Sequence, residues 1–212
     1  MEKTKVYNLI IIDESGSMQV IKQQAINGFN ETVQTIALAQ KKYPEQSHLV
    51  TLVSFNTEAV RTIVDLAPVS KAEELDSNSY QPKGGTPLYD AIGISLSKLR
   101  YQIEKEEEHQ VLVTIITDGE ENASHEFSGP MIKKMIEELK ELGWVFTFIG
   151  ANIDVEKVAT NISVNNYISF NQTDEGSKAM FTRESKSRMN FFDKMSKGMS
   201  KKDLSEKYFE EE

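Results

Sequence analysis

The residues best suited to chemistry lie near the N-terminus, where a short segment offers one carboxylate and two hydroxyls. Asp13, Ser15 and Ser17 follow directly on a run of apolar residues that is typical of a buried strand. Oxygen donors of this kind suit a small hard cation such as Mg²⁺ rather than zinc, which prefers imidazole and thiolate ligands. Two later segments, 84–87 (Gly-Gly-Thr-Pro) and 117–119 (Thr-Asp-Gly), offer further oxygen ligands. The sequence therefore indicates a cation site assembled from distant segments.

Such a site needs strands whose ends meet, and the rest of the sequence predicts them. Apolar runs bounded by turn residues alternate with helical patterns, which indicates β-α-β units. The link 56–58 is too short for a crossover helix, so the strands on either side of it form an antiparallel hairpin. We expect a doubly wound, Rossmann-like α/β fold: a mainly parallel six-stranded sheet with one antiparallel edge strand and helices on both faces. The predicted strands are 7–13, 48–55, 59–64, 111–117, 144–149 and 166–170, and the predicted helices are 18–42, a short one at 71–75, one from 86 to the charged stretch 104–108, 130–142 and 155–160.

This fold predicts where the site lies. In a doubly wound sheet, ligands bind at the carboxyl ends of the strands, where the strand order reverses. The strand that ends at Asp13 and the strand that precedes Asp118 are the natural neighbours at that point. We therefore expect Asp13 and Asp118 to approach each other across a crevice, with Thr86 joining them from a loop. Carboxylates neutralise a cation whereas hydroxyls add no charge, which leaves a position for a carboxylate from outside.

The spacing of these residues resembles the metal-ion-dependent adhesion site (MIDAS) of the von Willebrand factor type A (vWA) domain family. The family motif is Asp-x-Ser-x-Ser followed by a distant Thr and a distant Asp. The residues that match it in order are Asp13, Ser15, Ser17, Thr86 and Asp118. The resemblance implies that these five residues hold Mg²⁺, with Mn²⁺ or Ca²⁺ as alternatives, and that a partner protein completes the site with an Asp or Glu. A non-enzymatic protein-binding module of the stand-alone cytoplasmic type is the implied function.

Ordinary structural roles also account for each hydroxyl taken alone. Ser15 or Ser17 would cap the first helix, and Thr86 would cap the second, with Pro87 at its first helical position. The convergence of all these residues on one point favours the metal site over those separate roles. The polar neighbours of the motif are predicted to form its rim rather than to bind a cation: Glu14, Glu120, Glu121 and Asn122.

An enzyme is the alternative function. An Asp at a strand end also serves as the nucleophile of doubly wound phosphatases, so Asp13 would suit a Mg²⁺-dependent phosphoryl-transfer or hydrolase enzyme. Such enzymes usually carry a second acid two residues later, and Ser15 takes that position here. The sequence contains no phosphate-binding Gly-x-x-x-x-Gly-Lys loop either. We therefore favour binding over catalysis.

Length and local composition suggest how the chain is organised. Its 212 residues fit one large domain, which we place at 1–172. Residues 173–212 are polar and rich in Lys, Ser and Glu, so we expect a tail or a helical extension there. The histidines lie near element ends and in loops and are expected at the surface: His48, His109 and His125.

Composition excludes several other classes. The chain has no cysteine, which rules out disulfides, zinc fingers and cysteine nucleophiles. A net charge of −9 opposes nucleic-acid binding, and the Lys-rich stretch 183–207 contains no recognisable nucleic-acid-binding motif. No apolar run approaches the roughly 18 residues of a membrane span. The first apolar run is typical of a core strand rather than a secretory signal, so we expect no membrane partner and a cytoplasmic location.

Overall fold

The computed structural model describes residues 3–106, 108–205 and 208–209. In that part of the chain the strands are β1 (Thr4–Asp13), β2 (Gln46–Phe55), β3 (Val60–Pro68), β4 (His109–Thr117), β5 (Val145–Ala151) and β6 (Asn166–Phe170). The α-helices are α1 (Lys22–Lys42), α2 (Leu88–Ile103), α3 (Gly129–Glu141), α4 (Val155–Asn161), α5 (Asp174–Ser196) and α6 (Lys201–Ser205), and two 3₁₀ helices are η1 (Gly16–Ile21) and η2 (Val69–Lys71). All six predicted strands are present, most of them longer than expected.

The strands form one sheet in the order β3-β2-β1-β4-β5-β6. Among the described strands, only β3 runs antiparallel to its neighbour, and β1 pairs in parallel with both β2 and β4. The prediction of a doubly wound sheet with an antiparallel edge strand is therefore confirmed. The strand order reverses between β1 and β4, so the carboxyl ends of these two strands form the switch point where ligands bind in such sheets.

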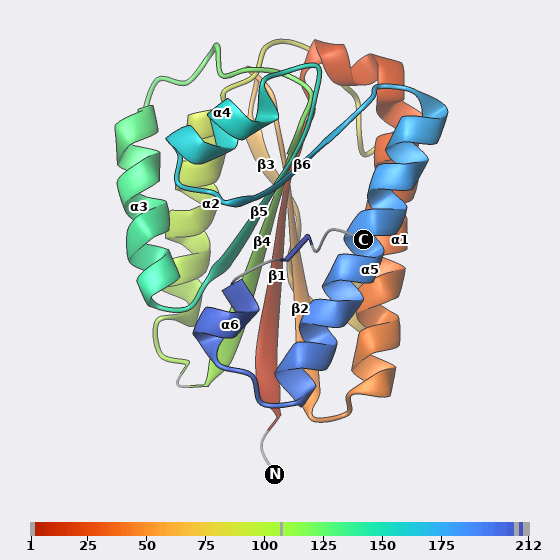
Figure 1. The fold of residues 1–212 in the computed structure, drawn as a ribbon. Helices are drawn as coiled ribbons and strands as arrows, with labels where there is room; N and C mark the ends of the chain where they lie inside the picture. The colour runs from red at the N-terminus through yellow and green to blue at the C-terminus, as the bar shows by residue number, and fades with distance from the viewer. Residues whose placement is uncertain (1–2, 107, 206–207, 210–212) are drawn as a thin grey trace.

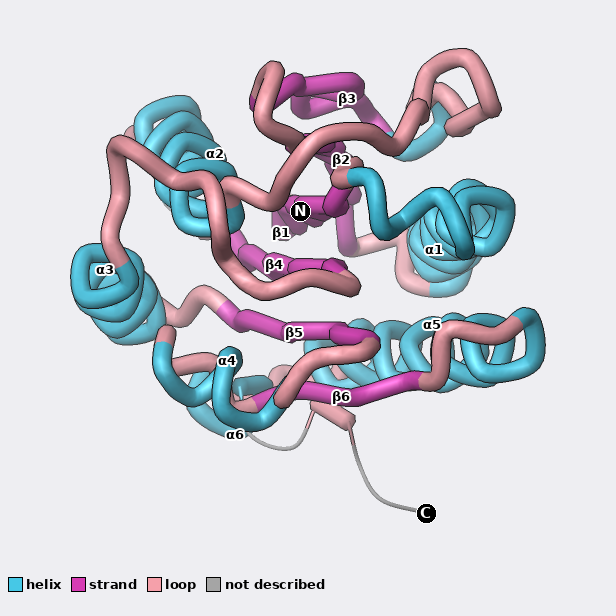
Figure 2. Tube along the Cα trace, turned by 90° about the horizontal axis from the view of Figure 1, so that it is seen from above, coloured by secondary structure: helices cyan, strands magenta, loops and turns pink. Residues whose placement is uncertain are grey.

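Helices cover both faces of the sheet, with α1 and α5 on one side and α2, α3 and α4 on the other (Figures 1 and 2). β1 is buried from Val6 to Asp13, as a parallel strand covered on both faces requires. Helical spacing places the apolar residues of α2 on one buried stripe. That stripe includes Leu88, Ala91, Ile92, Ser95, Leu96 and Leu99.

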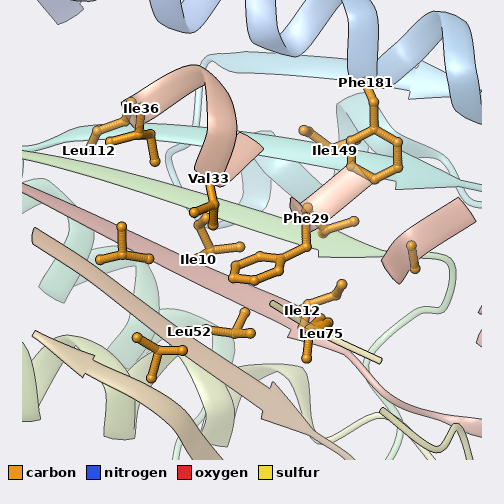
Figure 3. Packing of buried hydrophobic residues seen from close by; sticks show 14 of the residues in the cluster. Ile10, Ile12, Phe29, Val33, Ile36, Leu52, Leu75, Leu112, Ile149 and Phe181 are labelled. Carbon is orange, nitrogen blue, oxygen red and sulfur yellow. The ribbon is translucent and has the colours of Figure 1, made fainter. Parts of the chain in front are cut away.

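The layer between the sheet and α1 is apolar and closely packed (Figure 3). Ile10 and Ile12 of β1 face Phe29 of α1, and Phe181 enters the same layer from α5. Gly28 makes the approach of α5 possible, because a side-chain carbon there would lie 2.1 Å from the Phe181 ring. This apolar packing holds α5 along α1. It thereby positions the loop 171–173, which joins β6 to α5, at the carboxyl ends of the strands.

Two local predictions are wrong where loops approach the sheet, and the alternative capping role of Thr86 is absent there as well. Residues 16–21 form η1, so α1 begins at Lys22 instead of residue 18. The helix predicted at 71–75 is absent, because the Leu75 N–H donates to the Asn30 side chain at 2.9 Å and the Leu75 side chain packs into the core. Thr86 does not cap α2, which begins at Leu88 without a side-chain cap at the preceding residue.

The prediction that His48 lies at the surface is also wrong. His48 is 1% exposed because α5 covers it, and its ring lies 4.5 Å from that of Phe192, measured between centroids. Burial lowers the pKa of His48 to about 4, and the positive charge of Arg188 lowers it further in the same direction. His109 is half-buried and His125 is exposed.

The segment after residue 172 is largely helical. α5 lies along α1, and α6 follows it and contacts β5 (Figure 1). Leu204 and Tyr208 are buried against the same core, while residues 206–207 and 210–212 of this segment lie outside the described residues. Across the described part of the chain, no helix has the length and apolar composition needed to cross a membrane.

A buried polar cluster lies between α5 and the sheet. Arg188 has no exposed surface; its Nε donates to Glu184 Oε1 at 2.8 Å and its Nη1 to Asn8 Oδ1 at 3.1 Å. Arg188 Nη2 donates to Thr114 Oγ1 at 2.8 Å. Tyr208 donates its hydroxyl proton to Glu184 Oε1 at 3.1 Å. The cluster therefore pairs its buried acid with its own buried cation.

Candidate metal centre

The first carboxylate of the candidate site ends β1. Asp13 has no exposed surface, and its two oxygens accept from different elements. The Ser15 N–H donates to Asp13 Oδ1 at 2.7 Å, because the chain turns sharply into η1. Thr117, the last residue of β4, donates its hydroxyl proton to Asp13 Oδ2 at 2.6 Å. The parallel pairing of β1 with β4 thus fixes the Asp13 carboxylate from both sides.

The second carboxylate follows β4. Asp118 is 4% exposed, and Ser17 donates its hydroxyl proton to Asp118 Oδ1 at 2.6 Å. The hydroxyl oxygens of Ser15 and Ser17 lie 3.1 Å apart. Ser17 is exposed, so this group of carboxylates and hydroxyls opens to solvent. The structure therefore brings four of the five predicted residues into one hydrogen-bonded group.

Thr86, the fifth predicted residue, lies beside the same group. A side-chain carbon at Gly119 would lie 3.0 Å from Thr86 Oγ1, so the bare glycine lets the hydroxyl approach the residue after Asp118. Asn122 holds Thr86 in place through two contacts: the Thr86 N–H donates to Asn122 Oδ1 at 2.9 Å, and the Asn122 N–H donates to the Thr86 carbonyl at 3.1 Å. Asn122 therefore positions Thr86.

The loop after Asp118 is fastened to the start of α2, and this explains why Thr86 is not needed as a cap. The Glu121 carboxylate accepts from the Tyr89 N–H at 2.9 Å, and the Asp90 N–H donates to Ser124 Oγ at 3.0 Å. These contacts satisfy backbone N–H groups that the first turn of a helix leaves without partners. The hydroxyl of Thr86 is thus left for the site.

Glu14 lies within the motif but faces away from it. Its carboxylate accepts from Arg61 Nη2 at 2.6 and 2.8 Å and from the Gln81 N–H at 2.6 Å. The backbone of the same loop is held as well, since the Gly16 N–H donates to the Gly84 carbonyl at 2.9 Å. Glu14 thus anchors the loop to β3 and to the segment before Thr86.

The two site carboxylates have no counter-ion in the part of the chain that the structure describes. Neither Asp13 nor Asp118 forms an ion pair with any residue that the structure describes. Burial raises the pKa of Asp13 to about 6; the hydrogen bonds from Thr117 and Ser15 oppose this shift, and the nearby charge of Asp118 adds to it. Burial also raises the pKa of Asp118, against the hydrogen bonds from Ser17 and Gln172. The site is therefore short of positive charge.

The donors suit a hard cation. Within the described residues, no three His, Cys, Asp or Glu side chains gather as a metal site, so an ion here would depend on hydroxyls as well as carboxylates. Mg²⁺ is commonly bound by one or two carboxylates and keeps other oxygen ligands, which is the donor set present. The residues available to hold it are Asp13, Ser15, Ser17, Thr86 and Asp118.

Sequence reasoning missed two contributors. Thr117 donates to Asp13, and Gln172 donates its side-chain N–H to Asp118 Oδ2 at 2.6 Å. Gln172 follows β6, and the carboxyl ends of parallel strands meet at one edge of a sheet. For Gln172, its place directly after a predicted strand was the only signal in the sequence that it would lie near the site. A single glutamine after a strand is part of no recognisable motif.

Comparisons with known proteins agree with this fold. The sequence profile of the family described as von Willebrand factor type A domain matches residues 9–184. No curated protein matches the chain. Similar solved structures include the PilB minor pilin from Streptococcus sanguinis (11% identity, TM-score 0.61) and the pilus adhesin SpaC from Lactobacillus rhamnosus GG in an open conformation (14%, 0.63). The vWF domain of the type V pili tip protein Mfa5 from Porphyromonas gingivalis is similar as well (11%, 0.56).

These structural matches differ in how much of each neighbour they include. They cover 89%, 91% and 94% of this chain and 62%, 30% and 98% of PilB, SpaC and the Mfa5 domain respectively. The chain thus spans less than two thirds of PilB and less than one third of SpaC. At these identities the likeness concerns the fold. Because the family profile extends from β1 into α5, the chain belongs to the von Willebrand factor type A domain family.

Proposed function

We propose that this chain is a metal-dependent protein-binding module with a MIDAS-type site. Asp13, Ser15, Ser17, Thr86 and Asp118 would hold Mg²⁺, with Mn²⁺ or Ca²⁺ as alternatives, and a partner protein would add an Asp or Glu. The observation that carries the proposal is the convergence of two buried carboxylates with the hydroxyls of buried Ser15 and exposed Ser17, with no basic partner among the described residues. A bound cation supplies the positive charge that attracts a partner's carboxylate.

The hydrogen bonds support this use of the hydroxyls. Ser17 donates its only hydroxyl proton to Asp118, so the neighbouring Ser15 hydroxyl is the donor to Ser17, and one lone pair of the Ser17 oxygen stays available to a cation. Ser15 lies next to Ser17 at 3.1 Å and adds a further oxygen without adding charge. Membership of the vWA family supports the same reading, as do the adhesin and pilus tip protein among the fold neighbours.

Catalysis by Asp13 has less support. Both of its oxygens accept hydrogen bonds, from the Ser15 N–H and the Thr117 hydroxyl, which reduces its strength as a nucleophile. The position two residues later provides the hydroxyl of Ser15 where a second acid would be expected. Binding is therefore the function that we propose.

Direct measurement of cation binding tests the first half of the proposal. Isothermal titration calorimetry with Mg²⁺ and Mn²⁺ should show one site in the wild type and none in Asp13→Ala. Asp65→Ala is the matched control, because it removes a half-exposed carboxylate that pairs with Lys98 outside the site. Equal binding by all three proteins would contradict the assignment of Asp13.

Partner capture tests the second half. The immobilised chain should retain a protein in Mg²⁺ and release it into a chelator, and Asp13→Ala should retain none. Acidic residues of the captured protein should then be replaced one at a time by their amides. Capture that survives both the chelator and Asp13→Ala would overturn the metal-dependent function.

A further inference from the structure

A side-chain amide lies against the candidate metal centre at the end nearest α5. Gln172 belongs to the loop between β6 and α5, and its Nε2 donates to Asp118 Oδ2 at 2.6 Å. The same nitrogen donates to the backbone carbonyl of Ser17 at 3.4 Å. Asn152, in the loop between β5 and α4, donates its own amide to Gln172 Oε1. Because a carboxylate only accepts, the nitrogen end of Gln172 faces Asp118, and its oxygen end accepts from Asn152.

This contact changes the charge balance of the site. Ser17 engages Asp118 Oδ1 and Gln172 engages Oδ2, so both oxygens of this carboxylate are satisfied by neutral donors. The N–H groups of Gln172 place partial positive charge beside a buried carboxylate that has no counter-ion among the described residues. A cation entering the site therefore gains less from Asp118 than it would from a bare carboxylate, and it is repelled by the N–H groups if they stay in place.

We propose that Gln172 is a positioning residue that lowers the affinity of this site for divalent cations by substituting for part of the cation's charge at Asp118. The inference rests on the proposed function, because it concerns the same site. Gln172 orders Asp118 in the absence of the ion, and its hydrogen bond to Asp118 weakens when the ion binds. The affinity of the site is then set by a residue outside the five-residue motif.

A second role for the same side chain makes the opposite prediction. A carboxamide can bind a cation through its oxygen, but Gln172 Oε1 faces Asn152 instead of Asp118. Removing a metal ligand weakens binding, whereas removing a competing donor strengthens it. The sign of the change in affinity therefore separates the two roles.

The test compares Mg²⁺ and Mn²⁺ affinities of the full chain by isothermal titration calorimetry. Gln172→Ala should bind about tenfold more tightly than the wild type, which corresponds to about 1.4 kcal/mol. Gln24→Ala is the matched control, because Gln24 also donates its amide to an aspartate, Asp174, in the first turn of α5 but away from Asp118. Its affinity should equal that of the wild type.

Thermal unfolding provides a second readout that a merely structural role would not move in this way. Gln172→Ala should have a lower melting temperature than the wild type without metal and should show the larger rise when Mg²⁺ is added. Asn152→Gly keeps the test usable if Gln172→Ala fails to fold. Asn152 has a φ of 55°, which glycine adopts without strain, and loss of its amide should give a smaller gain in affinity.

The outcomes separate the two proposals. If the wild type binds neither cation, the proposed function fails and this inference fails with it. If the wild type binds and Gln172→Ala binds equally or more weakly, the inference alone is overturned. Tighter binding by Gln172→Ala, with the Gln24→Ala control unchanged, supports it.

Discussion

Two clusters of buried charge in this molecule are balanced in opposite ways. Beneath α5, Glu184 is paired with Arg188, and Asn8 and Thr114 accept the remaining guanidinium contacts. At the carboxyl ends of β1 and β4, the Asp13 carboxylate accepts only from hydroxyl and backbone N–H groups. The first cluster contains its own cation, whereas the second has only neutral donors among the described residues.

The difference separates structural charge from functional charge. A buried ion pair offsets the cost of taking its members out of water and leaves little to attract a ligand. A buried carboxylate pair without a counter-ion keeps that cost, which appears as the raised pKa of Asp13. Such a site gains most from a cation supplied from outside. The following predictions test this contrast, from the largest expected effect to the smallest.

The largest effect on stability is expected when the ion pair of the first cluster, Glu184 with Arg188, is broken. Arg188→Met leaves Glu184 buried without its cation, and Glu184 Oε2 already has no hydrogen-bond partner in the described part of the chain. The free energy of unfolding should fall by about 3–5 kcal/mol, measured by urea denaturation. Replacing both residues, as Arg188→Met with Glu184→Leu, should recover much of this loss.

An exposed ion pair is the control for that experiment. Lys98→Met removes the cation that pairs with Asp65 on the surface at 2.8 Å, and it should change stability by less than about 1 kcal/mol. If Arg188→Met with Glu184→Leu is as unstable as Arg188→Met alone, packing rather than charge balance stabilises the cluster of Glu184 and Arg188.

Acid should lower the stability of the folded protein through His48, which is buried near Arg188. Because the pKa of His48 is lowered to about 4 from its usual 6.5, the folded protein favours the neutral ring. Its contribution to stability is complete above pH 6.5 and is lost as the pH falls toward 4, to a total of about 3 kcal/mol. His48→Gln should therefore lose less stability than the wild type over this range. Parallel stability curves for the two proteins would contradict the prediction.

The candidate metal centre should respond to pH in the opposite direction. Because the pKa of Asp13 is raised to about 6 from its usual 3.8, the folded protein without metal favours the neutral acid. Its contribution is complete below pH 3.8 and is lost as the pH rises through 6, a change of about 3 kcal/mol. Asp13→Asn should lack this loss. Saturating Mg²⁺ should reduce the loss in the wild type, and an unchanged curve in Mg²⁺ would argue against a cation at Asp13.

The smallest effect concerns the support of Thr86. Asn122→Ala removes the side-chain acceptor of the Thr86 N–H, an interaction worth about 1 kcal/mol. Calorimetry should show Mg²⁺ binding about fivefold more weakly than in the wild type. Asn78→Ala, in an exposed loop, should leave the affinity unchanged. The direction is opposite to that expected for Gln172→Ala, so the two variants together show which amide supports the site and which one competes with a cation.

Much of this architecture follows from local pattern. The apolar run that ends at Asp13 predicts a buried strand, and the short link 56–58 predicts the antiparallel hairpin; both are confirmed. The ends of helices were less predictable. At the start of α2, a loop distant in sequence satisfies the backbone N–H groups that the sequence pattern would assign to a neighbouring side chain. Thr86 is a reasonable helix cap, yet Glu121 and Ser124 satisfy the start of α2 instead.

α5 is the element whose packing local sequence pattern predicts least well. Residues 173–212 are polar and rich in Lys, Ser and Glu, and this composition predicts a tail or a helical extension. In the structure, Arg188 and Glu184 are buried together, so charged residues occupy positions where a pattern of apolar residues would be expected. α5 also covers His48 and so places it in the interior, which local sequence could not predict.

The sequence by itself determined the types of donor at the candidate site and the order of strands that brings Asp13 next to the residues after β4. It could do so because strand ends meet at one edge of a parallel sheet whatever side chains follow them. Tertiary structure alone decided how each buried charge is balanced. Arg188 reaches Glu184, whereas only the amide of Gln172 reaches Asp118 Oδ2 among the described side chains. Such pairings depend on how helices and loops pack against the sheet. That packing is decided by contacts between residues that are far apart in the sequence.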